Sequence, residues 1–287
     1  MKKVAIVTDS NGGITEEESR DLCVAVLPMP VYIDKKQYFE GVDLSQEKFF
    51  ELLSNAAEVR TSQPSPAVVT DLWDELLKTH DEVVHIPMSS GLSGSCDSAK
   101  MLARGYDGKV EVVDNRRISV SLRRSVYDAV KLRDGGASAA GIKAELERTA
   151  AVSSIYITIE TLYYLKKGGR ITPLAAAVGS LLNIKPVLQI QGDKLDAYSK
   201  VRGKKAARAV MIKAIKKDFE TRFCSEVAEG RMRLDVAYSG NLAEAEDWKR
   251  EVEEEFPGFT IGMAPLPLSV ACHIGEGSLA LACAVEL

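Results

Sequence analysis

The stretch Val83-Val84-His85-Ile86-Pro87-Met88-Ser89-Ser90-Gly91-Leu92-Ser93-Gly94-Ser95 joins a short β-branched run to a loop of serines and glycines. The run predicts a buried strand over 83–87, and the residues after the loop predict a helix over about 94–104. Strand, polar loop and helix in this order are typical of an α/β protein. Backbone N–H groups and hydroxyls at the start of the helix would form an anion site. The simpler alternative is that Ser93 or Ser95 only caps the helix.

The same alternation of strands and helices continues in both directions along the chain. Further strands are expected over 3–8, 110–113, 155–159, 187–190, 195–198, 234–238, 260–263 and 279–285, and an extended segment over 23–33. Further helices are expected over 45–55, 66–79, 119–133, 138–150, 162–167, 172–182, 203–219 and 241–255. A second unit is expected to begin near Ser153. The pattern predicts two α/β domains, residues 1–152 with a mainly parallel sheet and residues 153–287 with a mixed sheet.

Composition excludes several classes of protein. The 287 residues are 46% hydrophobic and 27% charged, as in globular proteins, and the formal net charge of −4 gives no overall attraction to nucleic acid. The five cysteines lie at least eleven residues apart and form no C-x-x-C motif, so neither a disulfide framework nor a zinc site is expected. No signal peptide or membrane helix is expected either. We therefore expect a cytoplasmic protein without a metal, a cofactor or stable membrane insertion.

A second hydroxyl cluster, Thr61-Ser62-Gln63-Pro64-Ser65-Pro66, also precedes a predicted helix. By itself it is explained as a capped loop that prolines stiffen. Two such helix starts near strand ends are a more specific observation. Ligands bind at the carboxyl edge of an open α/β sheet, so both clusters could hydrogen-bond one small anion there.

His273, in Cys272-His273-Ile274-Gly275-Glu276-Gly277, is the third candidate. An imidazole can donate to an anion near neutral pH, although a lone histidine can equally be structural. Because Gly91-x-Ser93-x-Ser95 nearly fits the nucleophile elbow G-x-S-x-G, a serine hydrolase of acyl esters using Ser93 and His273 is an alternative. Only seven residues follow Ala280, so the glycines after His273 cannot open a dinucleotide-binding βαβ unit.

Two basic segments remain, Lys166-Lys167-Gly168-Gly169-Arg170 and the run from Arg202 to Lys217. The second holds seven basic and no acidic residues. A solvated helix face is one interpretation, and a docking patch for an acidic partner is another. A regulatory DNA-binding role is the third, but the run has neither interleaved aromatic residues nor a known motif.

Together these segments resemble the DegV family. The resemblance rests on seven motifs in the family's order: Val7-Thr8-Asp9-Ser10, Thr61-Ser62-Gln63-Pro64, Ser90-Gly91-Leu92-Ser93-Gly94-Ser95, Tyr164-Leu165-Lys166-Lys167-Gly168-Gly169-Arg170-Ile171, Leu182-Asn183-Ile184-Lys185-Pro186, Arg202-Gly203-Lys204-Lys205 and His273-Ile274-Gly275. They are spread over essentially the whole chain. Members of this family are bacterial fatty-acid-binding proteins of phospholipid metabolism. Some present the bound fatty acid to a fatty acid kinase, which makes the acyl phosphate.

The resemblance implies a non-catalytic carrier of a long-chain fatty acid, which binds between the two α/β domains. Thr61 and Ser93 would hydrogen-bond the carboxylate, and His273 would belong to the same polar network. Ser62 and Gly94 would be adjacent. Arg170 and Arg202 would lie near the head-group opening or on the surface that docks the kinase.

One departure from the family concerns Asn115-Arg116-Arg117, where members usually have a serine after the strand. We expect the two arginines to alter the pocket entrance or the partner surface. The apolar helix over 172–182 and the pair Phe49-Phe50 are candidates for the wall of the acyl tunnel, although core packing explains them equally well.

Overall fold

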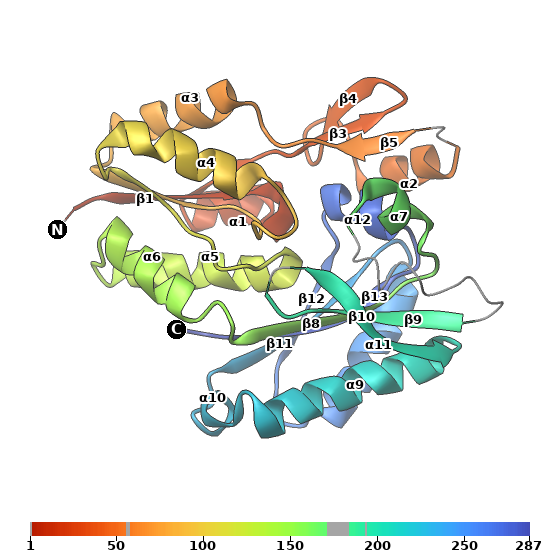
Figure 1. Ribbon diagram of the computed structural model, residues 1–287. Helices are drawn as coiled ribbons and strands as arrows, with labels where there is room; N and C mark the ends of the chain where they lie inside the picture. The colour runs from red at the N-terminus through yellow and green to blue at the C-terminus, as the bar shows by residue number, and fades with distance from the viewer. Residues whose placement is uncertain (1, 56–57, 171–183, 193) are drawn as a thin grey trace.

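The computed structural model describes residues 2–55, 58–170, 184–192 and 194–287. Its two larger sheets lie one above the other, with helices between them and on both outer faces (Figure 1). The expected strands and helices in the described residues are present, with ends shifted by a few residues. The expected helix over 172–182 lies outside the described residues. Within the part that the structure describes, no helix has the length and hydropathy needed to cross a membrane.

The first sheet is parallel throughout, as predicted. Its strand order is β2 (Val24–Leu27), β1 (Val4–Asp9), β6 (Glu82–Ile86) and β7 (Val110–Val112). Helices α3 (Pro66–Leu77) and α4 (Ser95–Ala103) cover one face, and α5 (Ser119–Asp134) and α6 (Ala139–Arg148) cover the other. Helix α1 (Glu16–Asp21) begins at a capping box, in which Glu18 N donates to Thr15 Oγ1 over 3.2 Å and Thr15 N donates to Glu18 Oε2 over 2.9 Å. The short helix η2 (Arg104–Tyr106) follows α4.

The second sheet is mixed, as predicted. Its order is β10 (Leu195–Arg202), β9 (Ile184–Ile190), β8 (Ser153–Thr158), β13 (Leu279–Val285), β11 (Met232–Tyr238) and β12 (Ile261–Pro265), and only β11 and β12 pair in parallel. Helices α9 (Lys204–Thr221) and α11 (Leu242–Glu255) pack on its outer face, and α10 (Cys224–Ala228) follows α9.

Helix α5 lies between the two larger sheets and explains how they share one core. Val120, Leu122 and Val126 are buried in a hydrophobic cluster with residues of both sheets. On the side toward β11, the Arg124 guanidinium makes two hydrogen bonds of 2.8 and 2.7 Å to the Asp235 carboxylate. Because the core continues across residue 152, the division into domains 1–152 and 153–287 remains a prediction.

A third, antiparallel sheet was not anticipated from the sequence. It has the order β4 (Lys36–Phe39), β3 (Pro30–Ile33) and β5 (Val59–Thr61), and α2 (Gln46–Asn55) packs beside it. The extended segment over 23–33 therefore supplies strands to two different sheets. The C-terminal helix α12 (Leu268–Ile274) packs on this small sheet, next to α7 (Tyr163–Gly168) and to the short helix η1 (Ser10–Gly12). This packing brings two segments that are far apart in the sequence, η1 and α12, into contact.

Candidate functional site

A largely apolar cavity lies between the second sheet, the first turn of α5 and helix α12. It holds about 930 Å³ of space free of protein atoms, counting the part of its mouth that is open to solvent. Two alanines at paired positions, Ala237 on β11 and Ala280 on β13, line it beside Ile157 of β8. Because alanine side chains are short, this row of the sheet leaves room that larger residues would fill. The other apolar lining residues are Met29, Met88, Leu92, Ile118, Val120, Ile155, Leu165, Ile190, Leu195, Leu266, Val270 and Ile274.

Polar side chains collect at one part of the cavity wall, and a contact between Thr61 and His273 is central among them. Thr61 Oγ1 and His273 Nε2 are 2.9 Å apart, although the two residues are separated by 212 positions in the chain. Burial and, to a smaller extent, the positive charge of Arg170 lower the pKa of His273 to about 4. The imidazole is therefore neutral at physiological pH and carries one N–H. When Nε2–H donates to Thr61 Oγ1, the Thr61 hydroxyl keeps its own proton to donate to a ligand.

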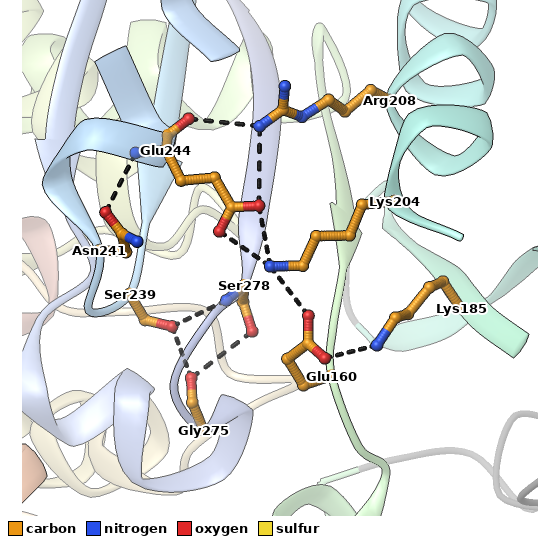
Figure 2. A network of polar contacts seen from close by, with 9 residues as sticks. All are labelled: Glu160, Lys185, Lys204, Arg208, Ser239, Asn241, Glu244, Gly275 and Ser278. Carbon is orange, nitrogen blue, oxygen red and sulfur yellow. Dashed lines mark hydrogen bonds and ion pairs between the residues drawn. The ribbon is translucent and has the colours of Figure 1, made fainter. Parts of the chain in front are cut away.

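The position of His273 is fixed by its surroundings. A Cβ atom on Gly168 would lie 2.2 Å from His273 Nδ1, so only glycine allows the end of α7 to approach the imidazole this closely. Helix α12 ends at Gly275, whose carbonyl accepts a hydrogen bond from Ser239 Oγ over 2.5 Å (Figure 2). Ser278 N donates to the same serine hydroxyl over 3.2 Å. The end of the helix that carries His273 is thus attached to β11 and β13.

Ser93 presents a hydroxyl proton to the cavity. Its Oγ accepts hydrogen bonds from Ser95 N over 3.2 Å and from Ser95 Oγ over 3.0 Å. Helix α4 begins after Gly94, and Gly94 makes no side-chain cap. Because both contacts use oxygen lone pairs of Ser93, its own O–H remains able to donate to a ligand. The capping alternative and the ligand alternative are therefore compatible.

The remaining predicted residues of this cluster differ in their positions. Ser62 is exposed and lines the cavity mouth, and its Oγ donates to the carbonyl of Gln63 over 3.2 Å. Gly94 does not line the cavity, but a Cβ atom there would lie 3.6 Å from Gln63 Oε1. Gln63 was not singled out from the sequence. It lines the cavity and accepts a hydrogen bond from Ser98 Oγ over 3.2 Å, which ties the two loops together.

Thr61 and Ser93 line the same cavity for a different reason than the sequence indicated. Both were expected at the carboxyl edge of one parallel sheet. The Ser93 loop does follow β6 of the parallel sheet, whereas Thr61 ends β5 of the small antiparallel sheet. The two residues face one cavity because the small sheet and α12 pack together beside the parallel sheet.

Asn11 and Ser119 were also missed in the sequence. Both line the cavity and are nearly inaccessible to solvent, with relative exposures of 1% and 5%. Asn11 was hidden in the turn after β1, where an asparagine needs no functional explanation. Ser119 begins α5 with a φ of +54°, a left-handed conformation that non-glycine residues rarely adopt. No sequence pattern marks such a residue in advance.

Arg170 and Arg202 occupy different environments. Arg170 lines the cavity and donates a hydrogen bond to the carbonyl of Gly168, near His273. Arg202 is exposed at the end of β10 and is not among the residues that line the cavity. Of the two arginines, the structure therefore brings only Arg170 to the polar cluster.

The basic run that begins at Arg202 is less of an open patch than its sequence indicates. Lys204 makes ion pairs of 2.9 Å with Glu160 and 2.8 Å with Glu244, and Glu160 also binds Lys185 (Figure 2). Arg208 Nη2 donates to the backbone carbonyl of Glu244 over 3.3 Å. These positive charges are neutralised within the chain because α9 lies against acidic residues of α11 and of the segment that follows β8. This arrangement weakens the nucleic-acid alternative, since these groups already have partners.

The structure answers two further expectations for particular residues. The expectation that the arginines after Asn115 alter the pocket entrance or the partner surface is wrong for Arg117: it is 2% exposed, and its guanidinium donates to Ser125 Oγ over 3.1 Å and to the carbonyl of Thr149 over 3.0 Å. It joins α5 to the end of α6, so its role is structural. Phe49 and Phe50 do not line the cavity, because they pack in the core between the small sheet and α12.

The geometry also argues against the serine hydrolase. Among the described residues, His273 hydrogen-bonds to Thr61 and not to Ser93, so no base is placed on the hydroxyl. His273 Nδ1 faces the backbone of Gly168 instead of a carboxylate that could stabilise an imidazolium. A pKa of about 4 further disfavours the protonated form that catalysis would require.

Fold and cavity define an α/β protein with two larger sheets, one small sheet and a mostly apolar cavity that opens to solvent. A family model described as an uncharacterised protein of the DegV family matches residues 3–286. The chain belongs to the DegV family, as the seven sequence motifs indicated.

One relative and two structural neighbours each cover 97% or more of the chain. A DegV domain-containing protein of Streptococcus pneumoniae is 31% identical over 283 residues, which are 97% of this chain and 98% of the relative. A DegV family protein from Thermus thermophilus, whose structure was described for its fatty acid binding, has a TM-score of 0.88 at 30% identity and covers 99% of both chains. DegV from Bacillus subtilis, described as a fatty acid binding protein, has a TM-score of 0.87 at 26% identity over 100% of both chains.

Proposed function

We propose that this protein binds one long-chain fatty acid, with its acyl chain in the apolar cavity and its carboxylate at the polar cluster. The observation that carries the proposal is the arrangement of the cavity, in which a continuous apolar lining meets the hydroxyls of Thr61 and Ser93 and the imidazole of His273. The DegV structures from Thermus thermophilus and Bacillus subtilis, described as fatty acid binding, support it.

The energetics favour an amphipathic ligand of this kind. Each buried methylene contributes about 0.8 kcal/mol, so a dozen contribute on the order of 10 kcal/mol before the cost of immobilising the ligand. A carboxylate cannot be buried without partners, because an unpaired charge would offset this gain. The hydroxyls of Thr61 and Ser93 can donate to it, the imidazole of His273 orients the Thr61 hydroxyl, and Arg170 adds a positive charge nearby.

Fatty acid binding is tested first on the protein as purified. Native mass spectrometry should detect one bound fatty acid, which solvent extraction would identify. After delipidation, titration with palmitate should show saturable binding with one site. Thr61→Val and Ser93→Ala should each weaken it by about 10-fold or more, because each removes a hydrogen bond to a charged group.

Thr70→Val is the matched control for Thr61→Val. Its hydroxyl donates only within α3, to the carbonyls of Pro66 and Ala67 over 3.1 Å, and Thr70 does not line the cavity. This variant should bind palmitate like the unmodified protein. Absence of saturable binding in the delipidated protein would refute the proposed function.

We further propose that the protein is a non-catalytic cytoplasmic carrier, which presents the carboxylate to a fatty acid kinase. Residues 1–152 supply Thr61, Ser62, Ser93 and Gly94, whereas residues 153–287 cover the acyl chain and add His273. Arg170 and Arg202 are the proposed docking residues. The kinase would phosphorylate the carboxylate where the polar cluster meets the cavity mouth.

Presentation is tested with a purified fatty acid kinase, ATP and the loaded protein. Acyl phosphate should form only when both proteins are present. Arg202→Ala should reduce its formation while fatty acid binding stays unchanged, because Arg202 does not line the cavity. Acyl phosphate made by this protein alone, or equal rates with and without it, would contradict the carrier role.

A further inference from the structure

Two polar atoms of the cavity wall lack a hydrogen-bond partner among the described residues. They are Asn11 Nδ2 and Ser119 Oγ, each on a side chain that is more than nine-tenths buried. Burial raises the pKa of the Asp9 carboxyl to about 6, and the nearby Asn11 side chain lowers it in part. The contact between Asn11 Nδ2 and Asp9 does not have the geometry of a hydrogen bond. Buried polar groups are normally paired, so both atoms call for a partner inside the cavity.

The elements that carry these two atoms are neighbours in the fold. Helix η1, which carries Asn11, packs on the start of α5, since a Cβ atom on Gly12 would lie 3.6 Å from Leu122 Cγ. Ser119 lies one helical turn before Leu122, on the same face of α5. The two polar side chains thus approach the cavity from neighbouring elements.

Helix α12 links Asn11 to the proposed carboxylate site. Ser269 Oγ donates to Asn11 Oδ1 over 2.5 Å, which leaves the amide nitrogen of Asn11 on the other side of the group. Ser269 is one helical turn from His273, and Cβ atoms at this spacing lie about 5–6 Å apart. The amide of Asn11 is thus linked to the helix that carries His273, and Ser119 lies on the element next to Asn11. A ligand with its carboxylate at Thr61, Ser93 and His273 would therefore place its carboxyl end, and not its methyl end, nearest these two atoms.

We propose that this cavity prefers a fatty acid that carries a hydroxyl or keto oxygen near the carboxyl end over an unsubstituted one. The inference rests on the proposed function and adds the substrate class. Methylene groups placed against Asn11 and Ser119 would leave both polar groups unpaired. An oxygen there would accept from the amide and exchange a hydrogen bond with the serine hydroxyl.

The test compares three ligands of equal chain length on the delipidated full-length protein. Palmitate, β-hydroxypalmitate and ω-hydroxypalmitate are titrated by calorimetry. We expect β-hydroxypalmitate to bind about 5-fold more tightly than palmitate, as one additional neutral hydrogen bond provides. The ω-hydroxyl should weaken binding, because it would enter the apolar part of the cavity.

Variants connect the preference to the two residues. Ser119→Ala and, separately, Asn11→Leu should reduce the ratio of the two affinities toward one. Ser121→Ala is the control, since Ser121 is buried on the same helix but does not line the cavity, and it should keep the ratio. Thermal melts of all three variants establish that they are folded.

Two results would overturn the inference. Equal affinities for palmitate and β-hydroxypalmitate in the unmodified protein would show that the two polar atoms are satisfied in another way, such as by bound water, while fatty acid binding itself stands. A preference that survives in both variants would place the oxygen elsewhere. If no fatty acid binds at all, the proposed function fails and the inference fails with it.

Discussion

Replacing Gly168 with alanine tests whether His273 takes part in binding the carboxylate, without changing any group that would contact the ligand. The new Cβ atom would lie 2.2 Å from His273 Nδ1 and 2.9 Å from Cε1, well inside van der Waals contact. The imidazole has to move away from α7. Its 2.9 Å contact with Thr61 Oγ1 should then be lost.

The expected size of the effect follows from the hydrogen bond that is lost. The His273 contact orients the Thr61 hydroxyl, whose own hydrogen bond would go to the charged carboxylate. A hydrogen bond to a charged group contributes about 1.5–3 kcal/mol, which corresponds to about 10- to 150-fold in affinity. The lower end applies if the Thr61 hydroxyl still reaches the carboxylate without the imidazole, and the upper end applies if it does not. Fold stability should change less, because the clash is with a side chain at the edge of a cavity that has room for it.

The assay is displacement of a fluorescent fatty acid from delipidated protein, with thermal melts in parallel. Gly169→Ala is the matched control: the residue is adjacent, and its Cβ atom would meet nothing within 4 Å, although its φ of +66° adds backbone strain. It should lower the melting temperature slightly and leave the affinity near that of the unmodified protein. Equal affinities of the Gly168→Ala variant and the unmodified protein would refute the role assigned to His273.

Three other perturbations have defined outcomes. Ala280→Leu should fill the cavity beside β13 and shift the binding preference toward shorter acyl chains. Competition between fatty acids of graded length measures this preference, and an unchanged preference would place the acyl chain elsewhere. Burial raises the pKa of Glu40 from 4.5 to about 7, so ionisation costs the folded state stability as pH rises through this range. Urea melts should therefore show that Glu40→Gln gains stability relative to the unmodified protein as pH rises from 4.5 to 7, by no more than about 1.4 kcal/mol per pH unit. A free energy of unfolding of the variant that instead falls relative to the unmodified protein over this pH range would contradict the prediction. Arg124→Ala should lower the free energy of unfolding by about 2–3 kcal/mol in urea melts, because it leaves the partly buried Asp235 unpaired between α5 and β11. A loss below about 0.5 kcal/mol would mean that the pair is solvated like a surface ion pair.

Periodicity and turn residues were sufficient to predict the two larger sheets. Strand β6, its serine loop and α4 are read directly from local sequence, because each has the apolar spacing or the start signal of its element. Helix α12 was not predicted. Its buried Leu268, Ala271 and Cys272 contact residues of the small sheet more than two hundred positions earlier, and no local pattern records such a contact.

The candidate site was predicted in part. Residue chemistry and the family motifs selected Thr61, Ser93 and His273, which the structure brings to one cavity. Asn11 and Ser119 were missed because a buried, unpaired polar atom is a property of three-dimensional packing, and both residue types are common in turns and at helix starts.

The polar cluster combines groups from three separate structural units, and this affects how it would bind and release a ligand. Thr61 belongs to the small sheet, Ser93 to the parallel sheet and His273 to a helix attached to the mixed sheet. None of these units provides more than one of the three groups, so under the proposed function a carboxylate would be fully coordinated only while all three remain packed together. The hydroxyls of Thr61 and Ser93 carry no charge, so a small separation of the units would remove these donors without leaving an unpaired charge in the protein. That would lower the cost of releasing the carboxylate to a partner.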